Sequence, residues 1–270
     1  MNNSEWPHIY EERKVGPLHK TTIIAAAGKG GVGKTSICAA MVRLLAERYP
    51  EARILAIDAD PAVGLAAGLG VEAESTLDDI RKRIVASVER GEPKEAVELL
   101  GEARFQIFDT MVEKKGFSFL AIGRPESAGC YCKVNAYLKE VISLLAKDFD
   151  YVVIDGEAGI EQINRRVMEE VTHLVLVTDS SRKGVQVAKT IRKVAKELVM
   201  YRQCGAIVNR VSDPPVLALV DLSPVEMLVS IPADGEHAAN EVRGFSVFEL
   251  SSGAPLLQGV KKALERWEIL

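Results

Sequence analysis

The stretch Gly28-Lys29-Gly30-Gly31-Val32-Gly33-Lys34-Thr35-Ser36 decides the fold of this chain. Its spacing, a glycine followed after four residues by Gly-Lys-Thr, is the phosphate-loop pattern. An apolar run at residues 22–27 precedes it and predicts a buried strand. Apolar residues at helical spacing follow over residues 34–49, where Pro50 ends the helix. Because a phosphate loop requires a strand before it and a helix after it, we expect a nucleotide to bind here.

The residue types in this loop suit phosphate chemistry. All nine residues from Gly28 to Ser36 are candidate nucleotide contacts, because a glycine-rich backbone can turn its N–H groups toward a diphosphate at the positive end of a helix. We expect Lys34 to reach the β- and γ-phosphates. The Thr35 hydroxyl is the expected magnesium ligand.

Apolar runs alternate with helical patterns along the rest of the chain. This alternation predicts a single α/β phosphate-loop domain with a mostly parallel central sheet and helices on both faces. The domain is expected at residues 21–270, after an N-terminal extension at 1–20. It carries a helical insertion at 71–116, whose helices are expected to begin near Ser75 or Thr76 and near Pro93. The expected strands after the first lie at residues 54–57, 117–122, 151–154, 174–177, 206–208 and 227–229.

Composition excludes several classes of protein. The 270 residues carry a formal net charge of −4, which argues against a nucleic-acid partner because such proteins use basic surface to displace counterions. The first residues lack the apolar core of a signal peptide, and no apolar run is long enough to span a membrane. Four cysteines without a secretion signal indicate a reducing, cytoplasmic location. Histidines are isolated, so they predict no further metal site.

Acidic residues follow two of the expected strands. Asp58 and Asp60 come after residues 54–57, and Asp155 comes after residues 151–154. Carboxyl ends of parallel strands meet at one edge of a sheet, where phosphoryl transfer needs magnesium and an oriented water. We therefore assign Asp155 to the magnesium shell through water and Asp58 to the attacking water, with Asp60 as a further nucleotide-site candidate.

With its second lysine, Lys29, the loop resembles the deviant Walker A ATPases, which include the nitrogenase iron protein and the septum-positioning and plasmid-partition ATPases. The segments 58–61 and 155–159 share this resemblance, which covers roughly residues 21–260. It implies that ATP closes a face-to-face homodimer in which Lys29 reaches the nucleotide of the opposing subunit. It also implies an adenine site at the strand ends that carry Asn209, Arg210, Pro232 and Asp234.

A pair of cysteines suggests which branch of these ATPases the chain resembles. Cys130 and Cys132, in Gly129-Cys130-Tyr131-Cys132, offer two thiolates to one soft metal, which is too few for a closed site. A two-fold dimer supplies four sulfurs, a set that suits zinc and also an iron–sulfur cluster. Cys38 and Cys204 are expected in the core.

Residues 129–132 and 155–161 resemble the nickel-insertion ATPases that serve carbon monoxide dehydrogenase and acetyl-CoA synthase. This resemblance implies nickel or zinc at Cys130 and Cys132 across the dimer, and a client metalloenzyme of that type. The function expected is therefore an ATP-hydrolysing metallochaperone, with ATP/ADP, Mg²⁺ and Ni²⁺ or Zn²⁺ as ligands.

Two other functions remain open from the sequence. One is an ATP-gated electron-transfer protein with an iron–sulfur cluster. The other is a positioning ATPase that polymerises or binds a membrane through a terminal amphipathic helix. The last segment places Leu257, Val260, Leu264 and Trp267 at near-helical spacing. Such a stripe more often packs on its own domain, so we expect membrane binding to be absent.

Overall fold

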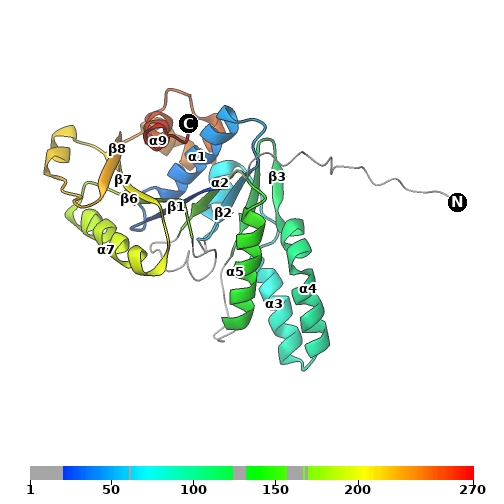
Figure 1. The fold of residues 1–270 in the computed structure, drawn as a ribbon. Helices are drawn as coiled ribbons and strands as arrows, with labels where there is room; N and C mark the ends of the chain where they lie inside the picture. Colours follow the sequence, from blue (N-terminus) through cyan, green and yellow to red (C-terminus); the bar gives the residue numbers. More distant parts are fainter. Residues whose placement is uncertain (1–20, 61, 124–131, 157–166, 168–169) are drawn as a thin grey trace.

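The eight strands of the computed structural model form one sheet, in the order β3-β4-β2-β5-β1-β6-β7-β8. The structure describes residues 21–60, 62–123, 132–156, 167 and 170–270 (Figure 1). Only β3 runs antiparallel to its neighbour in this sheet. The strands are β1 (Thr22–Gly28), β2 (Ile54–Asp58), β3 (Val112–Lys114), β4 (Phe117–Ala121), β5 (Tyr151–Asp155), β6 (His173–Thr178), β7 (Gln203–Val211) and β8 (Glu226–Pro232). The mostly parallel α/β fold expected from the sequence is confirmed.

Helices cover both faces of the sheet (Figure 1). One face packs against α1 (Lys34–Arg48), α2 (Gly64–Leu69) and α9 (Pro255–Arg266), whose apolar side chains share a core cluster with alternate strand residues. The other face packs against α3 (Leu77–Glu89), α4 (Pro93–Thr110), α5 (Cys132–Ala146) and α7 (Arg182–Leu198). Because both faces are buried, the central strands read as continuous apolar runs.

Among the described residues, the other helices are the 3₁₀ turns η1 (Pro214–Leu219) and η2 (Val247–Glu249), and α8 (Gly235–Arg243). Within α8 only Asn240 is buried, and the helix gives no residue to either core cluster. Core packing therefore contributes little to holding α8 in place, and its polar contacts matter more.

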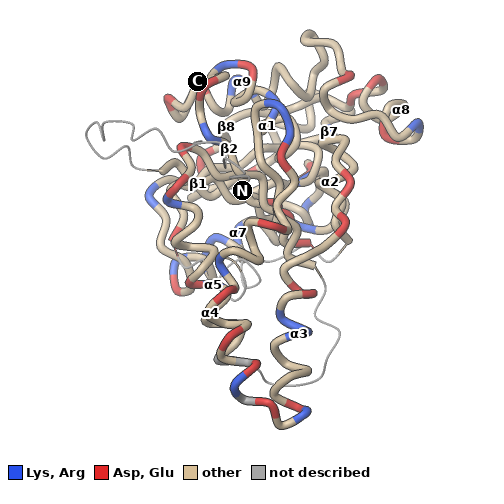
Figure 2. The backbone as a smooth tube through the Cα atoms, turned by 90° about the vertical axis from the view of Figure 1, so that its right-hand side faces the viewer, with Lys and Arg blue, Asp and Glu red and all other residues tan. Residues whose placement is uncertain are grey.

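Helices α3 and α4 form a hairpin that projects from the body of the protein, with charged residues along it and at its tip (Figure 2). Both helix starts predicted from the sequence are confirmed. The Asp79 carboxylate accepts hydrogen bonds from the Thr76 backbone N–H and hydroxyl, and Pro93 begins α4. The segment expected to be a helical insertion also contains β3, which the sequence analysis did not predict because three residues carry no recognisable alternation.

Helix α9 packs its apolar stripe against its own domain, as expected. Leu257, Val260 and Leu264 are buried in the core cluster of the α1 face, and the Trp267 ring lies 4.9 Å from that of His173. This burial leaves α9 no apolar face to place in a bilayer. In the part of the chain that the structure describes, no helix has the length and apolarity that spanning a membrane requires.

Candidate phosphate-binding site

The glycine-rich loop leaves the carboxyl end of β1, between the ends of β5 and β6. Two of its glycines are required by close approaches. A Cβ at Gly28 would lie 2.0 Å from the Val177 carbonyl oxygen, and one at Gly33 would lie 2.5 Å from Asn209 Nδ2. Gly33 also has a φ of 90°, in the left-handed region that favours glycine. The loop is thus wedged against β6 and β7, which fixes the start of α1.

The Lys34 side chain folds back over the loop. Its Nζ donates to the Gly28 carbonyl oxygen at 3.2 Å and to the Lys29 carbonyl oxygen at 3.3 Å, and the side chain is buried. A buried ammonium at the amino end of a helix is an arrangement that attracts phosphate.

Asp58 and Asp155 end two neighbouring strands and lie side by side in the sheet register, as the sequence predicted. Both are buried. Asp58 accepts hydrogen bonds from the Leu65 N–H at 2.8 Å and the Asp60 N–H at 3.1 Å, so its carboxylate organises the turn after β2. The Asp60 carboxylate accepts from the Ala62 N–H at 2.9 Å and is bound up in the same turn.

Burial raises the pKa of both carboxyl groups. The pKa of Asp58 rises to about 7, because of desolvation and the neighbouring charge of Asp155. Desolvation raises the pKa of Asp155 to about 6, while the Thr35 hydroxyl and the Lys34 charge oppose the rise. Two ionised carboxylates this close therefore call for a cation between or beside them.

The donor set near Asp155 fits a magnesium ion. Asp155 Oδ2 is buried and has no hydrogen-bond partner among the described residues, while the Thr35 hydroxyl lies within reach of the same carboxylate. Hard oxygen ligands of this kind are those that Mg²⁺ takes. Cys38, buried as expected, lies 3.9 Å from Asp155 Oδ1 through its sulfur, and burial raises the pKa of its thiol, so it stays protonated.

Lys29 contacts a residue that the sequence analysis missed. Its Nζ lies 3.3 Å from Asp179 Oδ2, just after β6. Burial opposes ionisation of Asp179, yet hydrogen bonds from Ser181 and Lys29 outweigh it and lower its pKa. The signal was present in the sequence, because Asp179 follows a predicted strand as Asp58 and Asp155 do.

Asn209 and Arg210 support the loop from the end of β7. The Asn209 amide donates to the Val32 carbonyl oxygen at 2.8 Å, and Arg210 donates to the Gly31 carbonyl oxygen at 2.9 Å. Of the two other residues assigned to adenine, Pro232 is exposed at the end of β8. Asp234 caps α8 by accepting from the His237 N–H at 2.9 Å. The structure thus brings Asn209 and Arg210 to the loop and gives Asp234 a capping role.

A hollow of about 250 Å³ opens beside Thr35 and Ser36. Helix α2 lines one side of it, and His237 and Glu241 of α8 line another. The Ser36 hydroxyl donates to Glu241 Oε1 at 3.0 Å. Neither His237 nor Glu241 could be assigned to the nucleotide site from the sequence, because no motif marks α8.

Residues 23–240 match the model of the CobQ/CobB/MinD/ParA nucleotide binding domain. The chain belongs to this family. A family model that spans most of the sheet, including the loop and both aspartates, confirms the nucleotide-binding part of the prediction.

Relatives of this CobQ/CobB/MinD/ParA family member cover nearly its whole length. It is 37% identical to the uncharacterized ATP-binding protein MJ0685 of Methanocaldococcus jannaschii, over 90% of this chain and 97% of that one. It is 32% identical to the carbon monoxide dehydrogenase accessory protein CooC of Rhodospirillum rubrum, over 84% of this chain and 90% of that one. The fold is similar to that of the septum site-determining protein MinD of Pyrococcus horikoshii, complexed with Mg-ADP, with a TM-score of 0.67 and 24% identity over 92% and 96% of the chains.

The expected metal site lies mostly outside the described residues. Cys130 and residues 157–161 fall there, and Cys132 is described only as the first backbone position of α5. Within the described ranges, no three His, Cys, Asp or Glu side chains gather into a metal-binding group. Cys204 is partly buried in β7, and burial raises the pKa of its thiol to about 11.

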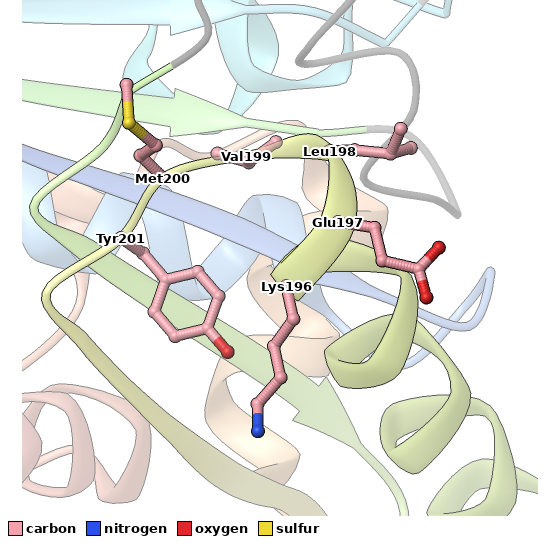
Figure 3. Close-up of a pocket in the computed structure, with 6 residues that line it drawn as sticks. All are labelled: Lys196, Glu197, Leu198, Val199, Met200 and Tyr201. Carbon is pink, nitrogen blue, oxygen red and sulfur yellow. The ribbon is translucent and has the colours of Figure 1, made fainter.

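A second hollow, of about 370 Å³, lies at the edge of the sheet opposite to the phosphate loop (Figure 3). It is lined by the consecutive residues 196–201, which end α7 and lead to β7. Gln203, two residues later, pairs with the first residue of β6, so this hollow is at the amino ends of the strands. Its side chains come from one segment and do not converge as those of a binding site do.

Proposed function

We propose that the chain is an ATP-hydrolysing homodimeric metallochaperone, which couples ATP-driven closure of the dimer to nickel insertion into an enzyme of the carbon monoxide dehydrogenase or acetyl-CoA synthase type. The observation that carries the ATPase part is the buried Asp155 oxygen without a partner, set beside Thr35 and the Lys34 ammonium. Support for nickel comes from the 32% identity to CooC together with Cys130 and Cys132.

The loop supplies the binding of the nucleotide in this proposal. Backbone N–H groups of residues 28–36 hold the phosphates, and Lys34 gives up its two carbonyl contacts for the β- and γ-phosphate oxygens. Thr35 and Asp155 hold magnesium, which neutralises charge on the phosphates when bound. Asn209, Arg210, Pro232 and Asp234 flank the side on which the adenine binds.

Asp58 orients the attacking water. Two backbone N–H groups fix its carboxylate, and the raised pKa lets it accept a proton near neutral pH. Asp60 shapes the same turn.

Lys29 is the residue that acts between subunits. It must leave Asp179 to place its ammonium against the nucleotide of the opposing subunit, in the manner of an arginine finger. The two side chains of this ion pair are 34% and 33% exposed, so breaking it costs little. Closure of the dimer therefore competes with a weak contact.

The metal is the cargo of the protein. Two thiolates from each subunit, Cys130 and Cys132, make a set of four soft ligands when the dimer closes. Cys132 begins α5, which packs against α3 and leads through its far end to β5 and Asp155. This connection offers a route by which loss of the γ-phosphate alters the thiolate pair.

The test is a titration of reduced, anaerobic protein with Ni²⁺ and with Zn²⁺, with the size of each sample measured with and without MgATP. The matched variant replaces both Cys130 and Cys132 by alanine. Cys204→Ala serves as the control, because Cys204 lies in β7, five strands from β4 in the sheet order. We expect one metal per dimer in the wild type and the control, and none in the double variant.

Two results would contradict the metallochaperone. If the wild type and the Cys204→Ala control bind no metal while MgATP still produces a dimer, the chain is a nucleotide switch with another output. A brown preparation with iron–sulfur absorption, lost in the double variant, would identify an electron-transfer protein instead.

A further inference from the structure

We infer that Glu241 is a latch on the phosphate loop that a bound nucleotide must displace, so that this carboxylate lowers the affinity for nucleotide. The inference rests on nucleotide binding at the loop, as proposed above, and adds a residue of α8 that regulates it.

Glu241 connects α8 to the phosphate loop at two points. It contacts the end of the loop directly and the middle of the loop through Arg210. The Ser36 hydroxyl donates to Glu241 Oε1 at 3.0 Å. Glu241 Oε2 lies 4.0 Å from a terminal nitrogen of Arg210, whose other terminal nitrogen donates to the Gly31 carbonyl oxygen at 2.9 Å. One side chain of α8 thus contacts Ser36 directly and Gly31 through Arg210.

The place that Glu241 occupies is one that favours anions. Ser36 lies in the first turn of α1, where backbone N–H groups and the helix dipole attract negative charge. A nucleotide phosphate at the loop and the Glu241 carboxylate compete for the same hydroxyl and the same field. Like charges repel in this partly buried place. The phosphate and the Glu241 carboxylate therefore cannot both keep their full interaction with the Ser36 hydroxyl and the helix dipole.

Glu241 is free to turn away while the rest of α8 stays in place. Asp234 caps the start of the helix, and its second oxygen accepts from the Leu256 N–H at 3.3 Å. Beyond the helix, Arg43 of α1 donates to the carbonyl oxygens of Val247 and Leu250 at 2.7 and 2.8 Å. The Glu241 side chain itself is 48% exposed, so solvent is available to it once it leaves Ser36.

His237 gives the hollow a second group for a ligand. Its Nε2 lies 3.4 Å from Glu241 Oε1, yet it is buried and makes no hydrogen bond of good geometry. When Glu241 turns away, this nitrogen faces the hollow beside Thr35 and Ser36 without its carboxylate neighbour. Displacement of one side chain therefore changes the charge of the hollow and uncovers a polar group in it.

The experiment measures the dissociation constant of a fluorescent ADP analogue, with magnesium, for four proteins. They are the wild type, Glu241→Gln, Ser36→Ala and the double variant. Glu265→Gln is the control, since it removes a comparably exposed carboxylate from α9. We expect Glu241→Gln to bind about two- to fivefold more tightly than the wild type, because half-exposed polar contacts are weak. In the Ser36→Ala background the same change should have little effect.

Three results overturn the latch. Weaker binding by Glu241→Gln would mean that the carboxylate helps to hold the nucleotide or merely supports α8, which a lowered melting temperature would reveal. Unchanged affinity would mean that Glu241 yields without cost. If the wild type and Glu241→Gln both fail to bind while their folds are intact, nucleotide binding at the loop is itself wrong and the latch falls with it.

Discussion

The phosphate loop and the α3–α4 hairpin differ in how each holds its backbone. In the loop, side chains from β7 and the Lys34 ammonium contact carbonyl oxygens, and two glycines are pressed against neighbouring atoms. Along the hairpin, α4 buries Ala103, Ile107 and Thr110 and leaves Val97 and Phe105 exposed by 67% and 72%. The loop tolerates almost no change of shape, whereas Val97 and Phe105 on one face of the hairpin are left uncovered by the residues that the structure describes.

The largest effect is expected from Lys34→Ala. Loss of the ammonium removes the charge that faces the phosphates, so hydrolysis of ATP should fall by about 100-fold or more. Circular dichroism and metal binding without nucleotide should be unchanged, because Lys34 begins α1 on one face of the sheet, whereas the hairpin and α5 cover the other face. If Lys34→Ala also loses metal binding, the phosphate loop and the cysteine pair Cys130 and Cys132 are not independent of each other.

Two glycine substitutions compare the regions directly. Gly33→Ala places a Cβ at φ 90° and 2.5 Å from Asn209 Nδ2, so it should destabilise the protein by about 1–3 kcal/mol. Gly101→Ala, in α4, meets no atom within 4 Å and should stabilise it by about 0.5–1 kcal/mol. Denaturant unfolding of both variants tests the pair. Equal changes in the free energy of unfolding for the two variants would contradict the difference between the loop and the hairpin.

The pH dependence of MgADP binding comes next in size. Between the ordinary carboxyl pKa of 3.8 and the values of about 6 and 7, Asp155 and Asp58 hold protons that an unfolded chain releases. Stability contributed by these two groups is therefore present at low pH and lost as pH rises through 6 to 7.

Magnesium at Asp155 should expel a proton in this range, so the calorimetric enthalpies of MgADP binding near pH 6 should differ between buffers of different ionisation enthalpy. Asp155→Asn should abolish that difference.

The smallest effect is expected on the hairpin surface. Phe105→Ser should change the free energy of unfolding by less than about 0.5 kcal/mol, because the side chain is 72% exposed. Ile107→Ala, two residues away and fully buried, should cost about 2–5 kcal/mol. A large loss from Phe105→Ser would mean that another part of the protein covers this face.

The sequence predicts the loop and the two carboxylates well because each rests on local patterns. Gly28 to Ser36 is contiguous, and Asp58 and Asp155 follow strands whose apolar runs are long enough to recognise. The carboxyl ends of parallel strands meet at one edge of the sheet, so predicting the sheet also predicts that the two carboxylates lie near the loop.

Residues that approach the loop from distant segments could not be found in this way. Asp179 and Glu241 contact Lys29 and Ser36 across separations of 150 and 205 residues, and no spacing rule links such pairs. Asn209 was placed near the nucleotide by resemblance, yet its contact is with Val32 of the loop. The short β3 went unnoticed for the opposite reason, since three residues hold too little pattern.

That short strand bears on how copies of the protein can associate. β3 has three residues, and its last two, Glu113 and Lys114, are exposed and charged. A strand of this kind is a poor template for pairing with another chain, because few backbone groups are open and charge faces any newcomer. Growth of the sheet into a filament or an amyloid-like stack is thus discouraged at this edge.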